Sequence, residues 1–258
     1  MLLRDVIGPE LPYLRRYARA ITGSQGLGDA AVREMLEALI EAPDEFDHDA
    51  PAREELYRVF HRIWNQASLQ PVSESSDDGN GANLPITARQ ALLLSAVEGF
   101  SESQAANILG IEAADVASQI RDVRSAITNS LSGSIMIIED EPIIAMHLKS
   151  IVTKLGYEVT GVVRTHREAV KLASEVTPDL ILADISLADG SSGIDAVKEI
   201  LEEQFVPVIF ITAFPERLLT GERPEPAYLI TKPFEPETVS ATIWQAIIAH
   251  REREKHLA

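Results

Sequence analysis

The 258-residue chain has no cysteine, no lysine before Lys149 and no apolar run long enough to cross a membrane. The absence of cysteine excludes disulfides, thiolate metal sites and a cysteine nucleophile. Because the sequence shows neither a signal peptide nor an apolar run of about 18 residues, we expect a cytoplasmic protein without a membrane segment. The six histidines lack the spacing of metal ligands, and His147 is interpreted as a surface or packing residue.

Polar residues in the C-terminal half each follow a short apolar run: Glu139 and Asp140, then Asp184, Thr212 and Lys232. The runs span 135–138, 180–183, 208–211 and 228–231 and are separated by helical patterns, which predicts parallel strands buried on both faces. In such sheets ligands bind beyond the carboxyl ends of the strands. We therefore expect all five side chains to meet in one crevice.

The residue types predict the chemistry of that crevice. Three carboxylates brought together repel one another unless a hard divalent cation lies between them, and a few carboxylates plus water are the ligands that Mg²⁺ prefers. A carboxylate beside Mg²⁺ is a nucleophile for a phosphoryl group. Lys232 can pair with phosphate oxygens, and Thr212 can donate a hydroxyl hydrogen bond. A lone Asp or Thr at a strand end is usually a cap or a strand former, but four matches in the correct order favour a phosphoryl-accepting site.

Four segments resemble the motifs of two-component receiver domains: Ile137–Pro142, Asp179–Asp184, Phe210–Ala213 and Thr231–Phe234. The resemblance covers 134–251 and implies a flavodoxin-like, doubly wound sheet of five parallel strands, with a cis peptide bond before Pro233. It implies that Asp184 is the phosphoacceptor. It also implies that the ligands of Mg²⁺ are Glu139, Asp140, Asp184 and the backbone carbonyl of Ser186. The phosphate-binding or switch residues that it implies are Thr212 and Lys232.

The receiver-like part departs from the family pattern at two places. Receivers commonly have an aromatic residue three positions before the lysine, where this chain has Leu229, with Tyr228 one position earlier. The stretch 214–226 contains three prolines and Gly221, which leave little room for a regular helix between the fourth and fifth strands. We interpret 215–226 as a candidate transmitter, because it directly follows the segment of Thr212.

The N-terminal half shows helical periodicity and no strand-like runs. A polar, turn-rich linker at 69–83 separates a helical domain at 1–68 from a second at 84–128, and a short linker precedes the receiver domain at 134–251. In the second piece Ser101 and Gln104 form a capping box, and Gly110 lies between two helices. This helix-turn-helix pattern resembles region 4 of extracytoplasmic-function sigma factors, and the first piece resembles region 2 more weakly. The predicted class is thus all-α followed by α/β.

The charge of the sigma-like part argues against DNA binding. The whole chain has a net charge of −17, and residues 1–133 hold 11 Arg and no Lys against 20 Asp plus Glu, which gives 11 − 20 = −9. Nucleic-acid binding relies on cationic side chains, yet the predicted recognition helix carries three acidic residues beside two arginines. These residues are Glu112, Asp115, Asp122, Arg121 and Arg124. The clustered Arg15, Arg16 and Arg19 keep a phosphorylation-activated DNA-binding regulator open as an alternative.

The order of region 2, region 4 and receiver resembles the PhyR-type general stress response regulators. The resemblance implies a regulator and not an enzyme. It implies that a sensor histidine kinase phosphorylates Asp184, that a resting contact between receiver and sigma-like part is released, and that the sigma-like part then sequesters a NepR-type anti-sigma factor and frees a stress sigma factor. A receiver that acts mainly as a phosphoryl sink is a third possibility.

Overall fold

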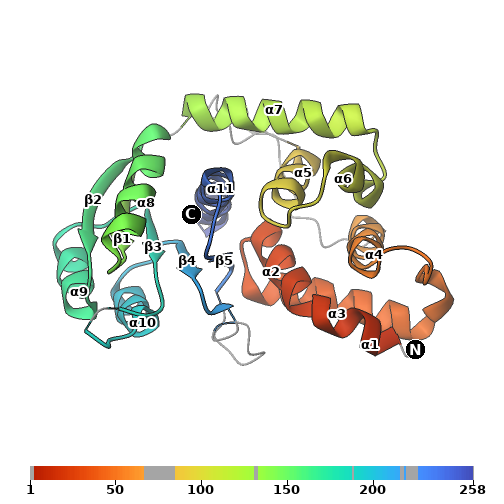
Figure 1. Ribbon diagram of the computed structural model, residues 1–258, viewed down its shortest axis with the longest axis horizontal. Helices are drawn as coiled ribbons and strands as arrows, with labels where there is room; N and C mark the ends of the chain where they lie inside the picture. The colour runs from red at the N-terminus through yellow and green to blue at the C-terminus, as the bar shows by residue number, and fades with distance from the viewer. Residues whose placement is uncertain are drawn as a thin grey trace. The chain divides into compact units, whose positions relative to one another are not determined.

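The chain divides into two compact units, Met1–Ser125 and Ala126–Ala258 (Figure 1). The computed structural model describes residues 3–66, 85–130, 133–187, 189–215, 218 and 226–257. The predicted linker at 69–83 and most of the predicted transmitter at 215–226 lie outside these ranges. Within them, no helix is both long and apolar enough to cross a membrane.

The first unit is helical, as predicted. Its helices are α1 (Leu3–Ile7), α2 (Leu11–Thr22), α3 (Gln25–Glu41), α4 (Ala52–Gln66), α5 (Ile86–Ala96), α6 (Glu102–Leu109) and α7 (Ala113–Ser130), with short 3₁₀ turns at Gly8–Glu10 and Pro43–Glu45. We call 3–66 the first helical piece and 85–125 the second helical piece. The largest fully buried side chains of the first piece include Leu14, Tyr17, Met35 and Phe60, so α2, α3 and α4 share one core.

Local signals in the sequence explain where these helices begin and end. The side chain of Ser24 accepts a hydrogen bond from the amide of Leu27 and starts α3, while Gly23 ends α2 with φ at 62°. The predicted capping box of Ser101 and Gln104 starts α6, and Gly110 ends α6 with φ at 68°. The predicted helix-turn-helix is therefore confirmed as α6 and α7.

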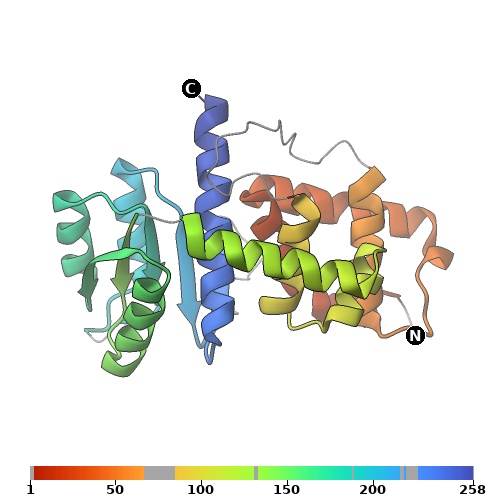
Figure 2. The same ribbon diagram turned by 90° about the horizontal axis from the view of Figure 1, so that it is seen from above.

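The second unit is an α/β layer structure. Its elements are β1 (Ser134–Ile138), α8 (Pro142–Lys154), β2 (Glu158–Val163), α9 (His166–Glu175), β3 (Leu180–Ala183), α10 (Gly193–Glu203), β4 (Val208–Thr212), β5 (Tyr228–Thr231) and α11 (Pro236–Leu257). The five strands are parallel in the order β2-β1-β3-β4-β5. Figure 2 shows α11 along its length as it runs to the C-terminus.

The sheet is covered by helices on both faces, since α8 packs with α11 and α9 packs with α10. Every residue of Ile135–Ile138 and Leu180–Ala183 is buried, which explains why these strands read as continuous apolar runs. The predicted doubly wound, five-stranded receiver fold is confirmed. The residues described between β4 and β5 include none in an α-helix.

Candidate functional site

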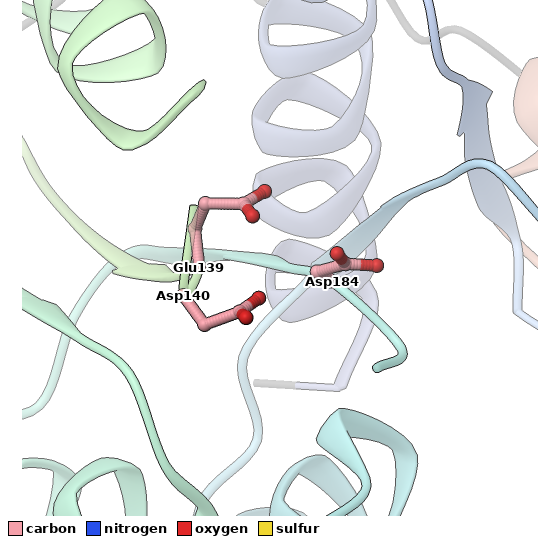
Figure 3. A group of neighbouring side chains, drawn as sticks. All are labelled: Glu139, Asp140 and Asp184. Carbon is pink, nitrogen blue, oxygen red and sulfur yellow. The ribbon is translucent and has the colours of Figure 1, made fainter. Parts of the chain in front are cut away.

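Three carboxylates gather at the carboxyl ends of β1 and β3. Glu139 and Asp140 directly follow β1, Asp184 directly follows β3, and the pairing of Ile138 with Ala183 brings the two strand ends side by side. One carboxylate oxygen from each residue lies within 4.8 Å of the others (Figure 3). Glu139 and Asp184 are buried, with 1% and 7% of their surfaces exposed. The predicted acidic crevice is present in the structure.

Lys232 provides the positive charge of the crevice. Its Nζ atom lies 2.8 Å from Oε2 of Glu139 and 2.8 Å from Oδ2 of Asp184, and 3.5 Å from Oε1 of Glu141. Partial burial opposes the charged ammonium, but hydrogen bonds to Asp184 and Glu139 outweigh that effect and raise the pKa of Lys232. The lysine is therefore held as a cation against both buried carboxylates.

Glu139 has the opposite balance of influences. Burial raises the pKa of its carboxyl group, and the nearby charge of Asp184 acts in the same direction, while the hydrogen bond from Lys232 opposes both. Burial and the neighbouring negative charge thus outweigh the single ammonium of Lys232, which faces a group of three carboxylates. The site therefore has room, electrostatically, for a further cation.

Thr212 and the Lys232–Pro233 turn complete the strand-end arrangement. Thr212 ends β4 with a fully buried side chain, and its Oγ1 accepts a hydrogen bond of 3.1 Å from the amide of Phe214. The amide of Lys232 donates to the carbonyl of Thr212 over 2.8 Å, so the two residues lie on neighbouring strands. The predicted cis peptide bond between Lys232 and Pro233 is confirmed.

The structure shows the positions of Ser186 and Leu229, but it does not test their predicted roles. Ser186 is half-buried and forms an antiparallel bridge with Ser192 in the loop after β3. The ligand role of its carbonyl stays a prediction. Leu229 is buried in the core cluster that includes Phe210, so a buried aliphatic side chain stands where receivers commonly have an aromatic one.

The donor set fits a magnesium ion. Glu139, Asp140 and Asp184 offer one oxygen each within a small volume, and Mg²⁺ is a hard cation that binds carboxylate oxygens together with water. These three residues would hold the ion, which would neutralise their mutual repulsion and the charge of an arriving phosphoryl group.

Three further residues at the site were missed in the sequence. A Cβ atom at Gly193 would collide with the backbone carbonyl of Asp184, so only glycine fits beside the strand end. Arg164 donates from Nη2 to the backbone carbonyl of Asp140 over 3.0 Å, and Glu141 lies near Lys232 as described. These contacts join residues far apart in the chain, and no local pattern reports them.

The arginine cluster of the helical unit does not form the open basic face that was considered. Arg15 and Arg19 both donate to Asp29 of α3, and Arg16 donates to Glu98. The side chains of Arg16 and Arg19 are 9% and 0% exposed. Asp29 of α3 and Glu98 of the turn after α5 thus engage these three arginines, which argues against the DNA-binding face that their clustering had left open.

Comparisons with known proteins cover both units. Three family models match the chain: the Sigma2 domain of PhyR over residues 7–61, the sigma-like domain of the response regulator PhyR over 82–129, and the response regulator receiver domain over 135–243. The phyllosphere-induced regulator PhyR of Methylorubrum extorquens is 49% identical over 267 aligned positions, which cover 100% of each chain.

Solved structures agree with these matches over the whole chain. The response regulator PhyR of Brucella abortus is 47% identical, with 100% of this chain and 98% of that chain covered and a TM-score of 0.88. The anti-anti-sigma factor PhyR of Bartonella quintana is 47% identical, with both chains covered completely and a TM-score of 0.89. A sigma-like helical unit, a receiver fold with a carboxylate–lysine crevice, and similarity over the full length lead to one conclusion: this chain belongs to the PhyR family of response regulators.

Proposed function

We propose that this chain is an anti-anti-sigma factor, in which phosphorylation of Asp184 allows the sigma-like unit to sequester a NepR-type anti-sigma factor and so free a stress sigma factor. The carboxylate–lysine crevice in a chain of the PhyR family is the observation that carries the proposal. A relative that is similar over the whole of both chains is described as an anti-anti-sigma factor. The chain is then a cytoplasmic signalling protein and not an enzyme, with domains at 1–68, 84–128 and 134–251.

The chemistry of the proposed step follows from the contacts. A carboxylate oxygen of Asp184 attacks the phosphorus of a phosphohistidine on a sensor histidine kinase. The new O–P bond forms as the P–N bond breaks, and the imidazole leaves with its electron pair. Lys232, already 2.8 Å from Asp184, then pairs with phosphoryl oxygens as a point charge. Glu139, Asp140, Asp184 and the backbone carbonyl of Ser186 would hold a Mg²⁺ ion, which would neutralise the charge of these groups and of the phosphoryl group.

Thr212 connects the phosphoryl group to the segment after β4. Its hydroxyl oxygen accepts a hydrogen bond from the amide of Phe214 in the structure. The same hydroxyl has a proton to donate to a phosphoryl oxygen, and a turn of the side chain toward Asp184 would weaken the contact with Phe214. The change therefore enters the segment that leads into the proposed transmitter at 215–226.

The proposed output is release of a resting contact between the receiver and the sigma-like unit. Interfaces within a chain are usually moderate in size, and a phosphoryl group adds about −2 charge, so a shift of a few kcal/mol is enough to change the population of the released form. No observation favours DNA as the target instead, because the clustered arginines are paired with Asp29 and Glu98.

The proposal is tested by phosphorylation of the purified full chain with acetyl phosphate and Mg²⁺. Intact-mass spectrometry is expected to show one added phosphoryl group in the wild type and none in Asp184→Asn. Asp189→Asn removes an exposed carboxylate from the same loop and is the matched control, expected to be phosphorylated like the wild type. Phosphorylation of Asp184→Asn to the wild-type extent, or failure of the phosphorylated wild type to co-elute with a NepR-type anti-sigma factor, would overturn the proposal.

A further inference from the structure

A buried carboxylate lies at the junction of the two helical pieces. Glu98 follows α5, and its side chain is 0% exposed. Oε1 accepts hydrogen bonds from Arg16, over 2.8 Å from Nη2 and 3.2 Å from Nε. Oε2 accepts from Oη of Tyr57 over 2.9 Å and from Nη2 of Arg53 over 3.1 Å. A carboxylate has about four acceptor sites, so four donors satisfy this one completely. We call Glu98, Arg16, Arg53 and Tyr57 the Glu98 cluster.

The Glu98 cluster joins segments that are distant in the chain. Arg16 lies on α2 and is 82 residues from Glu98, while Arg53 and Tyr57 lie on α4. All three donors belong to the first helical piece, and their acceptor belongs to the second. The two pieces match different family models. The cluster is therefore a charged link between two sigma-like regions, and not a local stabilisation of one helix.

Arg53 also fixes the turn that leads into the helix-turn-helix. Its Nη2 atom donates to the backbone carbonyl of Glu98 over 2.8 Å, and its guanidinium lies 4.6 Å from the centre of the Phe100 ring. A second link runs beside it, because Glu54 of α4 accepts hydrogen bonds from the side-chain amides of Gln104 and Asn107 on α6. Both α4 links position α6 against the first helical piece.

The burial of these charges determines how the link responds to a perturbation. Desolvation opposes the charge on Arg16, but the neighbouring carboxylate of Glu98 outweighs it and raises the pKa of Arg16. Separation of the pieces would break all four hydrogen bonds to Glu98 at once and would expose the packed faces of α4 and α6 to water. Hydrogen bonds to a charged group are stronger than neutral ones, and the exposure of apolar surface adds to the cost. The moderate free energy available from a phosphorylation switch therefore leaves this link closed.

We propose that the Glu98 cluster preassembles the two helical pieces into one rigid body, which remains assembled on phosphorylation and binds the anti-sigma factor as a single surface. The binding of the anti-sigma factor rests on the proposed function. A preassembled surface avoids the entropic cost of ordering two tethered pieces when a partner binds. Glu98 is accordingly a positioning residue for partner capture, and it has no part in the phosphoryl chemistry.

The matched pair of variants is Glu98→Gln and Glu55→Gln in the full chain. Glu55 is also buried, and its two carboxylate oxygens each lie 2.6 Å from a donor of Arg58. That pair lies within α4 and does not join the two pieces. Both variants exchange a buried carboxylate for an amide of the same shape, so they differ in whether the lost charge links the pieces.

The first readout is the distance between spin labels on α3 and α7, measured by pulsed electron resonance. Because the chain has no cysteine, Glu37→Cys and Asp122→Cys introduce two unique labelling sites at exposed positions. The distribution is expected to be narrow in the labelled parent and unchanged by acetyl phosphate with Mg²⁺. It is expected to broaden in Glu98→Gln but not in Glu55→Gln. A shift on phosphorylation of the parent, or equal distributions in the two variants, would overturn the proposal.

The second readout is the affinity of the phosphorylated protein for a NepR-type anti-sigma factor. Glu98→Gln is expected to bind at least about tenfold more weakly than Glu55→Gln, with equal phosphorylation of Asp184, because the two pieces would have to be ordered on binding. Equal affinities would remove the role in partner capture. If the wild type binds no anti-sigma factor, the proposed function fails. The label distances still show whether the two helical pieces form one rigid body. If Glu98→Gln does not fold, Arg53→Lys replaces it, because lysine keeps the charge but loses the planar fork.

Discussion

His61 gives the helical unit a specific sensitivity to acid. The imidazole lies on α4 with 1% of its surface exposed, and its Nε2 is 2.8 Å from Oη of Tyr17. The rings of Tyr17 and Phe60 approach it edge-on at 5.6 and 5.5 Å. Burial lowers the pKa of His61 from the ordinary 6.5 to about 3. The folded unit therefore excludes a proton that the unfolded chain takes up.

The size of the effect follows from linkage. The folded pKa is depressed, so the unfolded state binds more protons between about pH 6.5 and pH 3, and the stability of the folded state falls as the pH falls through that window. At 1.36 kcal/mol per pKa unit, lowering the pH from 7.5 to 5 removes about 2 kcal/mol of folding free energy through this one group. A folded pKa one unit higher changes that figure little, because it would still lie below pH 5.

The assay is urea denaturation followed by the fluorescence of Trp64, which stacks on Phe60 at 5.9 Å in the same helix. A Trp244→Phe background leaves Trp64 as the sole tryptophan, since the chain has two. We expect His61→Gln to lose about 2 kcal/mol less than its parent between pH 7.5 and 5. His48→Gln, which removes an exposed histidine, is the control. An identical pH dependence in His61→Gln and its parent would show that His61 does not cause the loss of stability in acid.

Two further predictions concern packing and the metal. An alanine Cβ at Gly28 would lie 2.5 Å from the amide nitrogen of Arg19, whereas at Gly26 on the same helix the nearest atom is 3.9 Å away. In chemical denaturation, we expect Gly28→Ala to lower the free energy of unfolding by about 2 kcal/mol and Gly26→Ala to raise it by up to about 1 kcal/mol. Equal effects of the two substitutions would contradict the close contact of α2 and α3. In calorimetric titrations, we expect Glu139→Gln and Asp140→Asn each to weaken Mg²⁺ binding at least about tenfold, and Glu141→Gln to have a smaller effect. Unchanged affinity in all three variants would show that Mg²⁺ does not bind in the crevice.

The fold and the residues of the crevice could be predicted because their signals are local. A strand buried on both faces is a short apolar run, and the polar residue that ends it is adjacent in the sequence. Four such runs placed Glu139, Asp184, Thr212 and Lys232 at one edge of a sheet before any contact was known. The capping box at Ser101 and the glycine at Gly110 are local in the same way. The structure brings these residues together, while their roles in phosphorylation stay predictions.

The burial of the charged residues could not be predicted, because the residues next to a buried arginine in the sequence do not differ in kind from those next to an exposed one. Arg16 donates hydrogen bonds to Glu98, which is 82 residues away in the chain, and Arg19 donates to Asp29 on the next helix. The sequence therefore left open a basic cluster, whereas in the fold Asp29 accepts from both Arg15 and Arg19, and Glu98 accepts from Arg16. Gly193 was missed for a related reason, because its need for a bare Cα comes from the carbonyl of Asp184 and not from its neighbours.

We propose that phosphorylation of Asp184 controls capture of the anti-sigma factor. The most direct test of this proposal is the affinity of the full chain for a NepR-type anti-sigma factor, measured with and without acetyl phosphate and Mg²⁺, beside Asp184→Asn. We expect tight binding by the phosphorylated wild type and weak binding both by the untreated wild type and by the treated variant. Equal affinity in all three samples, or no binding in any of them, would contradict the proposal.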